Sequence, residues 1–157
     1  MESEVQTFYG NKIRIRVCGL CIVEDQILMI NHSGITSTDF WAPPGGGLNF
    51  GETAESCLKR EFLEETGLNI EVEEFLFVCE LIRHPLHAVE LFFKTRSIKS
   101  KLKKGIDPEA GSPSIIKEVK FMGWNEIQAI PSSQLHGIFQ HVDHPSKVIT
   151  LGGYFRV

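Results

Sequence analysis

The sequence predicts an α/β fold of the α+β kind, in which a mixed β-sheet is sandwiched between helices. Apolar segments of strand length recur along the 157 residues and are separated by turn-forming residues. One segment, residues 53–67, instead has apolar side chains at helical spacing and ends in a glycine. No repeat or low-complexity tract divides the chain, so we expect one domain over residues 1–157.

Two strands are expected near the N-terminus. Residues 13–23 begin with alternating apolar and arginine side chains and then turn fully apolar, which is typical of a strand that enters a buried sheet. After a Glu-Asp-Gln turn at 24–26, residues 27–32 form the second strand. Residues 33–39 are a polar loop, and the glycines and prolines in 40–52 exclude a helix there.

The middle segment carries the main expected helix. Thr53 or its neighbour starts it and Gly67 ends it, because threonine is a preferred N-cap and glycine is preferred just past a helix. Its inward-facing stripe consists of Ala54, Cys57, Leu58 and Phe62. Further strands are expected at 73–82, 87–98 and 119–124, and the first of these is apolar on both faces, as in a sheet covered on both sides. A short helix that follows Pro131 contains Leu135, Ile138 and Phe139.

Composition and charge limit the function. A formal net charge of -4 argues against non-specific nucleic-acid binding, which usually needs a basic excess. The N-terminal segment is acidic and polar, and no apolar run approaches the roughly 18 residues that are needed to span a bilayer. We therefore expect a soluble, cytoplasmic protein without nucleic-acid or membrane partners.

Cysteine and histidine spacing does not predict a zinc site. Cys18 and Cys21 are the only closely spaced cysteines, and such a pair can indicate zinc or redox chemistry. Residues three apart on a strand point to opposite faces, however, so buried, reduced thiols are the favoured interpretation. His136, His141 and His144 share neither a helical nor a strand face, which argues against a metal site near the end of the chain.

The segment REFLEETG, residues 60–67, places three carboxylates on one helical face. Glu61 lies three residues before Glu64 and four before Glu65, and like charges at that spacing repel by about 0.2–0.5 kcal/mol per pair. Gly67 puts them at the negative end of the helix dipole, which adds to the cost. Local stability therefore does not explain the cluster. Either the acids face water, or a positive group lies among them, and Mg²⁺ or Mn²⁺ suits carboxylate ligands.

The acidic helix is part of a longer pattern: Gly46, five residues, Glu52, seven residues, then REFLEETGL at 60–68. With the flanking WAPPGG of 41–46, this pattern resembles the Nudix box, and the chain is identified as a member of the Nudix hydrolase (MutT-like) family, most similar to small ADP-ribose pyrophosphatases. The resemblance implies the Nudix fold. A P-loop is excluded because GLNFGET has Glu52 where a lysine is needed, and no G-x-G-x-x-G follows the first strand.

The resemblance also implies a Mg²⁺ cofactor, with Mn²⁺ as the alternative, and water as the nucleophile. The implied metal ligands are the carboxylates of Glu61, Glu64 and Glu65 and the backbone carbonyl of Gly45. Arg60 would orient Glu64 by bidentate bonding. The residues with supporting roles in the loop and around the ligands are Gly46, Glu52 and Gly67.

A glutamate is expected to be the general base. Glu64 is the first choice and Glu61 the second. The expected catalytic residues are therefore Glu64, Glu61 and Arg60. Glu118 and Glu109 are further candidates for the base, and Glu109 lies in the lysine-rich stretch 99–114. We interpret that stretch as a solvated loop, with a flap that meets substrate phosphates as the alternative.

By resemblance, the reaction is hydrolysis of the diphosphate bond in a nucleoside diphosphate linked to another moiety. ADP-ribose or a similar nucleotide sugar is favoured, because Pro85 lies close to where a proline marks ADP-ribose hydrolysing members. The second reading is a nucleoside triphosphate pyrophosphohydrolase that sanitises the nucleotide pool. A sensor that binds a nucleotide derivative without cleaving it comes third, since the box is intact and no helix-turn-helix is evident.

Arginines and aromatic residues supply the expected substrate contacts. The first choices are Arg16, Trp41 and Arg83. They come from a wider group that also contains Arg14, Phe40, Phe92, Lys94 and Arg96, whose members could contact phosphates or stack on a base. A homodimer is also considered, because many members of the family dimerise.

Overall fold

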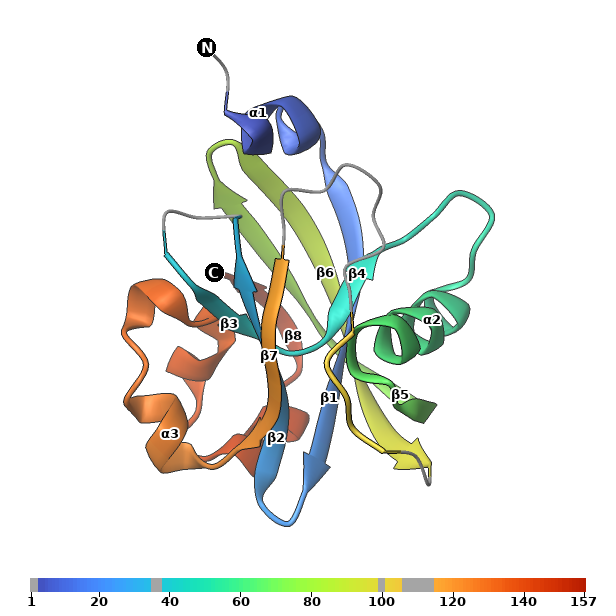
Figure 1. Cartoon of the computed structure of the whole chain (residues 1–157), viewed down its shortest axis with the longest axis vertical. Coiled ribbons are helices and arrows are strands. Elements are labelled where there is room, and N and C mark those ends of the chain that lie inside the picture. Colours follow the sequence, from blue (N-terminus) through green and yellow to red (C-terminus); the bar gives the residue numbers. More distant parts are fainter. Residues whose placement is uncertain (1–2, 35–37, 99–100, 106–114) are drawn as a thin grey trace.

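The computed structural model describes residues 3–34, 38–98, 101–105 and 115–157 (Figure 1). In these ranges the strands are β1 (Arg14–Val23), β2 (Gln26–Ser33), β3 (Phe40–Ala42), β4 (Gly45–Gly47), β5 (Asn69–Arg83), β6 (Leu86–Ile98), β7 (Ile115–Met122) and β8 (Gly153–Arg156). The α-helices are α1 (Glu4–Tyr9), α2 (Ala54–Thr66) and α3 (Trp124–Gln128), and 3-10 turns cover Ser132–Gln134, Gly137–His141 and Pro145–Thr150. No helix in the described part of the chain is long and apolar enough to cross a membrane.

Strand β1 organises the sheet. Among the described residues, eight strands connect in the order β3-β2-β1-β6-β5-β8, with β4 paired to β1 and β7 to β2. The β1–β6 pairing is parallel, whereas β2 and β4 pair with β1 antiparallel, which confirms the predicted mixed sheet. These registers set Arg16 opposite Glu90 and Cys18 opposite Gly45. The first strand, the glycine run and β6 therefore meet at one place.

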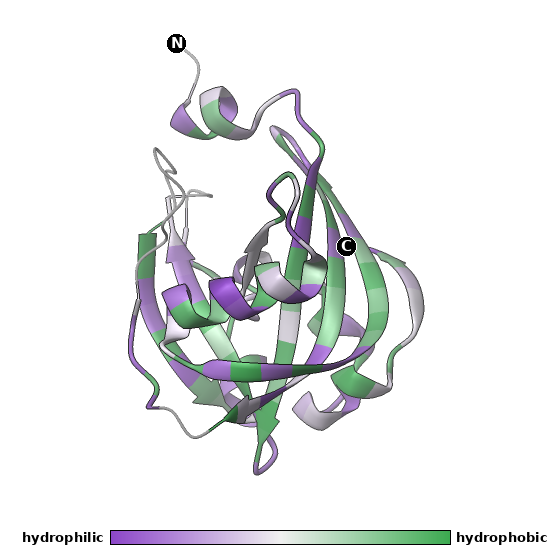
Figure 2. Cartoon of the chain, turned by 90° about the vertical axis from the view of Figure 1, so that its right-hand side faces the viewer, coloured by the Kyte–Doolittle hydropathy of each residue, from purple (hydrophilic) through white to green (hydrophobic). Residues whose placement is uncertain are grey.

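Helices cover both sides of the sheet, as predicted. Helix α2 lies on one side, and α3 with the C-terminal turns lies on the other (Figure 1). The cluster under α2, the α2 cluster, contains Val17, Cys21, Leu28, Cys57, Leu58, Phe62, Leu68 and Ile70. The cluster on the other side, the C-terminal cluster, includes Cys18, Leu20, Trp41, Phe77, Phe92, Ile127 and Ile138. Figure 2 shows α2 in front of the strands, with hydrophilic and hydrophobic bands along it.

The cysteines of β1 point to opposite sides of the sheet. Cys18 belongs to the C-terminal cluster and Cys21 to the α2 cluster, which confirms the prediction that their sulfurs diverge. Both thiols are free and buried, and burial raises the pKa of each. A buried thiol with a raised pKa is a poor nucleophile and a poor metal ligand, so these side chains serve packing.

Several boundaries differ from those predicted. Helix α1 was not expected, and Trp124 starts α3 instead of ending a strand, because its side chain packs against the C-terminal cluster. Strand β5 begins at Asn69, ahead of the expected residue 73, because β6 pairs with it along its length. Phe75 in its first half is 52% exposed, so the expectation of apolar burial on both faces is wrong at that end. The expected short helix after Pro131 is divided into 3-10 turns: Ile138 and Phe139 lie in one of them, and Leu135 lies between two.

Candidate active site

Helix α2 begins and ends where the sequence predicts. The Thr53 hydroxyl accepts a hydrogen bond from the Ser56 N–H at 3.1 Å. Gly67 adopts the left-handed conformation, with a φ of 73°, and its N–H donates to the Leu63 carbonyl. Beneath the helix, Cys57, Leu58 and Phe62 are buried and Ala54 packs against them at the edge. Burial of this stripe leaves the glutamates to face the glycine run of β4.

The start of the lysine-rich stretch covers the C-terminal end of α2. The Lys103 N–H donates to the Thr66 carbonyl, and the Gly105 N–H donates to the Glu65 carbonyl, both at 2.9 Å. These bonds satisfy carbonyls that a helix end otherwise leaves to water. This part of the stretch is therefore bonded to the helix through its backbone, while Lys101, Lys103 and Lys104 are exposed to solvent, as expected for a solvated loop. The remainder, which contains Glu109, lies outside the described residues.

The three glutamates of α2 lie beside the glycine run. Glu61 and Glu65 are buried, whereas the Glu64 side chain is 31% exposed. The Gly45 N–H donates to Glu65 Oε1 at 3.0 Å. A Cβ on Gly46 would lie 2.3–2.5 Å from the carboxylate atoms of Glu61, so only glycine lets β4 approach that side chain this closely.

Arg60 joins the glutamates to the loop before α2. Its guanidinium bonds both oxygens of Glu52, with nitrogen–oxygen distances of 2.7 and 3.0 Å. Its Nη1 contacts Glu61 at 2.8 Å and Glu64 at 3.2 Å. The bidentate partner is therefore Glu52, and the expectation that Arg60 grips Glu64 in this way is wrong. Because Thr53 is the N-cap, Glu52 lies just before the helix. Its side chain reaches along the first turns to Arg60.

The carboxylates of this network have pKa values shifted in opposite directions. Hydrogen bonds from Arg60 lower the pKa of Glu52 to about 2. Burial raises the pKa of Glu61, and the contact with Arg60 offsets only part of that rise. The charged form of Glu52 is therefore stabilised by the fold, whereas the charged form of Glu61 is destabilised until a further positive charge arrives.

The Glu52–Arg60 pair should make the protein acid-sensitive. The pKa of Glu52 falls on folding from 4.5 to about 2, so its stabilising effect is complete above pH 4.5 and is lost as the pH falls toward 2. Glu52→Gln should lower the melting temperature at neutral pH, and the gap to the native protein should shrink across that acidic window. Thermal unfolding followed at a series of pH values tests this. A constant gap would contradict it, and Glu74→Gln on exposed β5 is the control.

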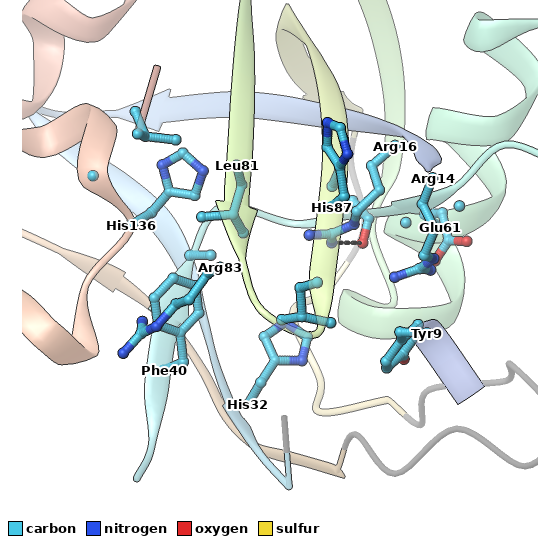
Figure 3. Close-up of a pocket in the computed structure, with 18 of the residues that line it drawn as sticks. Tyr9, Arg14, Arg16, His32, Phe40, Glu61, Leu81, Arg83, His87 and His136 are labelled. Atoms are coloured by element: carbon cyan, nitrogen blue, oxygen red, sulfur yellow. Dashed lines mark hydrogen bonds between the residues drawn. The ribbon is translucent and has the colours of Figure 1, made fainter. Parts of the chain in front are cut away.

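A cavity of about 620 Å³ opens next to the glutamates (Figure 3). Arg16 and Arg83, two of the expected substrate contacts, line it, and so do Arg14 and Phe40 from the wider group. His32 is also in the wall, where burial and the Arg16 charge lower its pKa to about 3, so its ring is uncharged at neutral pH. The α2 end of the cavity thus combines the glutamates with Arg60 and Arg16, and Arg14 and Arg83 are also in the wall.

Two aromatic candidates are not in the cavity wall. Trp41 is 9% exposed and packs in the C-terminal cluster, with the Lys120 ammonium 5.6 Å from the centroid of its ring. Phe92 is fully buried and stacks on Phe77 with ring centroids 4.8 Å apart. Both side chains therefore serve the core, which corrects their interpretation as rings that stack on a base.

Other candidates lie away from the cavity. Lys94 and Arg96 form ion pairs with glutamates of β5 and do not line it. Glu118, on β7, is half exposed and lies 3.7 Å from the Lys120 ammonium. It is absent from the cavity wall, so its position gives no support to a role as the general base.

Two buried polar residues at the cavity, Glu90 and its partner His136, were not predicted to belong to the site. Glu90 lies behind the wall, and His136 lines the cavity. His136 Nε2 lies 2.7 Å from Glu90 Oε1, and both side chains are almost fully buried. The signal for Glu90 was its position: it is an acid between Ala88 and Phe92, which face the core on the same side of the strand. A lone acid at an inward strand position needs buried partners.

The C-terminal histidines have partners other than a metal. His136 bonds Glu90, His141 packs against an aromatic ring, and His144 bonds a nearby serine at the start of a 3-10 turn. Within the described ranges, no three His, Cys, Asp or Glu side chains are grouped so that they could hold a metal ion. In this conformation Glu61 and Glu64 instead share the Arg60 guanidinium.

Known proteins resemble most of the chain. A profile of the NUDIX domain matches residues 12–139. An ADP-ribose pyrophosphatase of Methanocaldococcus jannaschii is 31% identical over 115 residues, which are 72% of this chain and 63% of that protein. An RNA pyrophosphohydrolase of Histophilus somni is 41% identical over 61 residues, which are 39% of this chain and 30% of that protein. The chain matches less than two thirds of the length of either relative.

Solved structures share the same fold. A NUDIX hydrolase from Nitrosomonas europaea superposes with a TM-score of 0.67 at 18% sequence identity, covering 80% of this chain and 81% of that one. At this sequence identity the superposition is evidence for the fold alone. It confirms the Nudix fold that the motif predicted. Because the domain profile covers most of the residues and the fold agrees, the chain belongs to the Nudix family.

Proposed function

We propose that this chain is a hydrolase that uses a divalent cation to cleave the diphosphate bond of a nucleoside diphosphate linked to another moiety. The proposal is carried by one observation: Glu61, Glu64 and Glu65 lie beside the glycine run in the wall of a cavity that is also lined by arginines. Carboxylates alone would repel a diphosphate. With a cation between them, the same carboxylates would hold the diphosphate in place.

Mg²⁺ fits the donors at this end of the cavity. Three carboxylates and the Gly45 carbonyl offer the hard oxygen ligands that Mg²⁺ and Mn²⁺ prefer. Burial already raises the pKa of Glu61, so a cation would relieve an existing electrostatic cost. When bound, the ion would activate a water molecule and stabilise charge on the diphosphate oxygens.

Glu64 is the proposed general base. Its side chain is 31% exposed, compared with 10% for Glu61, so it can reach a water molecule in the cavity. A carboxylate oxygen of Glu64 would take the proton as the water attacks phosphorus. Arg60 remains bonded to both oxygens of Glu52. This bidentate ion pair fixes the position of the guanidinium, which also contacts Glu64.

ADP-ribose or a similar nucleotide sugar is the favoured substrate. The cavity volume of about 620 Å³ falls within the range of small-molecule sites. Pro85 lies in the turn between β5 and β6, and the neighbouring Arg83 and Leu86 line the cavity. The match to the relative named ADP-ribose pyrophosphatase is also longer than the match to the relative named RNA pyrophosphohydrolase.

A substrate panel tests this function. The protein would be incubated with Mg²⁺ and ADP-ribose, other nucleotide sugars, dinucleoside polyphosphates, and standard and oxidised nucleoside triphosphates, and products would be resolved by chromatography. Release of AMP from ADP-ribose by the native protein, lost in Glu64→Gln, is the expected result. Pyrophosphate released from triphosphates would select the triphosphate reading. Metal-dependent binding without any turnover would support a sensor.

Mg²⁺ should raise the melting temperature of the native protein. A ligand that binds only the folded state stabilises it by about 2.7 kcal/mol at a concentration one hundred times its dissociation constant. The increase should be smaller in Glu64→Gln, which lacks one carboxylate ligand, and unchanged in Glu55→Gln, whose exposed side chain lies in the first turn of α2. Equal increases in all three proteins would place the ion elsewhere.

A further inference from the structure

Glu90 lies behind the cavity wall and has no part in the reaction proposed above. Its side chain is 2% exposed, and three donors surround it. Arg16 Nη1 donates to Oε2 at 3.1 Å, and the Cys18 thiol donates to the same oxygen at 3.5 Å. His136 Nε2 lies 2.7 Å from Oε1. A carboxylate with this many buried donors is built into the fold and is not a chance surface acid.

The hydrogen bonds define the state of this group. His136 Nδ1 accepts the Ile138 N–H at 3.2 Å, so the ring proton lies on Nε2 and points to Glu90. Burial raises the pKa of Glu90, but the contacts with His136, Arg16 and Cys18 outweigh burial and lower it to about 2. Glu90 is therefore a charged acceptor, and the Arg16 guanidinium forms an ion pair with it.

The other end of the Arg16 guanidinium reaches the proposed metal ligands. Arg16 Nη2 donates to the Gly45 carbonyl at 3.1 Å, and the Gly45 N–H donates to Glu65. Arg16 lines the cavity, and its side chain is 21% exposed (Figure 3). Glu61 and Glu65 are near enough to contribute to its electrostatic environment. Each terminal nitrogen of a guanidinium carries two N–H groups, so these bonds leave one on each for a ligand.

We propose that Glu90 is a positioning residue that holds Arg16 as the diphosphate-binding side chain of the cavity and keeps it off the carboxylates of Glu61 and Glu65. The inference rests on the proposed function, because it presumes that a diphosphate occupies the cavity. Arg16 has two sets of negative partners within reach, one behind the wall and one at the metal end. Without Glu90, the guanidinium would turn to the α2 glutamates and compete with a cation for them.

Binding without chemistry tests the proposal. The probe is the α,β-methylene analogue of ADP, whose carbon bridge cannot be hydrolysed, titrated calorimetrically in the presence of Mg²⁺. Arg16→Gln and Glu90→Gln should each weaken its binding about tenfold or more, as expected for the loss of a charged hydrogen bond. The double variant should bind no more weakly than Arg16→Gln alone, because Glu90 acts through Arg16. Glu74→Gln, on the exposed face of β5, is the matched control.

Mg²⁺ titrated alone gives a second readout that a general loss of structure would not produce. Glu90→Gln should bind Mg²⁺ more weakly than the native protein, because the released Arg16 competes for the α2 glutamates. The double variant lacks that competitor, so its affinity for Mg²⁺ should return toward the native value. If the second substitution restores Mg²⁺ affinity, Glu90 acts by positioning Arg16, because a variant that is merely destabilised would not recover when a further residue is changed.

Several results would overturn the proposal. These are native affinity for the analogue in Glu90→Gln, additive losses in the double variant, or a native protein that does not bind the analogue. Melting curves accompany every titration. If Glu90→Gln is unfolded at the assay temperature, the double variant, which removes both buried charges, is compared with Arg16→Gln instead. A protein that binds the analogue as described but cleaves no nucleoside diphosphate derivative of the substrate panel would refute the proposed function and leave the role of Glu90 standing.

Discussion

Glu64→Gln should reduce diphosphate hydrolysis by about 10²–10⁴-fold, the usual contribution of a general base. Glutamine has almost the same shape as glutamate, but it cannot take the proton of the attacking water. The substitution also removes a like charge beside Glu61, so the metal-free protein should melt at the native temperature or slightly above it. Hydrolysis of ADP-ribose in Mg²⁺ and thermal unfolding in a chelator measure the two effects.

The matched control for this variant is Glu55→Gln on the same helix. Glu55 is exposed and forms an ion pair with Lys59 at 2.7 Å, and exposed pairs contribute little to stability. Its hydrolysis rate should stay at the native level. If Glu64→Gln instead keeps the native rate, or if the metal-free variant loses much of its stability, then Glu64 is not the base and its role is structural.

Gly46→Ala should lower Mg²⁺-dependent hydrolysis by about 10–100-fold, as substitutions in the groups that orient metal ligands commonly do. The added Cβ would lie 2.3 Å from the Glu61 carboxylate carbon. The end of a side chain can move, so Glu61 would swing away from its present place and the fold would survive. Steady-state rates at increasing Mg²⁺ concentrations would show a raised Mg²⁺ requirement.

Two other alanine substitutions, at Gly45 and Gly123, separate this effect from general crowding. A Cβ on Gly45 would lie 2.4 Å from the Val17 carbonyl oxygen, which is backbone and cannot yield without opening the β1–β4 pairing. Gly45→Ala should therefore destabilise the fold by about 1–3 kcal/mol or more. Gly123→Ala has open space around its Cβ and lies away from the cavity, so it should leave the rate unchanged. A Gly46→Ala protein with native kinetics would show that Glu61 need not occupy its present position.

The features predicted correctly from the sequence depend on local physics. The limits of α2 follow from a threonine cap and a glycine that accepts a positive φ. The opposite burial of Cys18 and Cys21 follows from strand alternation alone. Both predictions need only neighbours within a few residues.

The features that were missed depend on contacts between distant segments. Trp41 is buried because the C-terminal turns and Lys120 pack around it. The residues next to Trp41 in the sequence do not predict these contacts. Arg60 prefers Glu52 because the preceding loop folds back over the helix, a geometry that helical spacing cannot supply. Glu90 acquires its role only when β6 pairs with β1. Local patterns therefore predicted the helix that carries the carboxylates, and the contacts of Arg16 with Glu90 required the tertiary structure.

The pairing of Arg16 with Glu90 also bears on how the chain finds its native strand alignment. The two residues are 74 positions apart in sequence, and such non-local pairings form slowly. A slip of β1 by one residue along β6 would set Ile15 or Val17 opposite Glu90 and turn Arg16 toward the apolar α2 cluster. Both misaligned states would bury a charge without a partner, so electrostatics, in addition to side-chain shape, selects the correct alignment during folding.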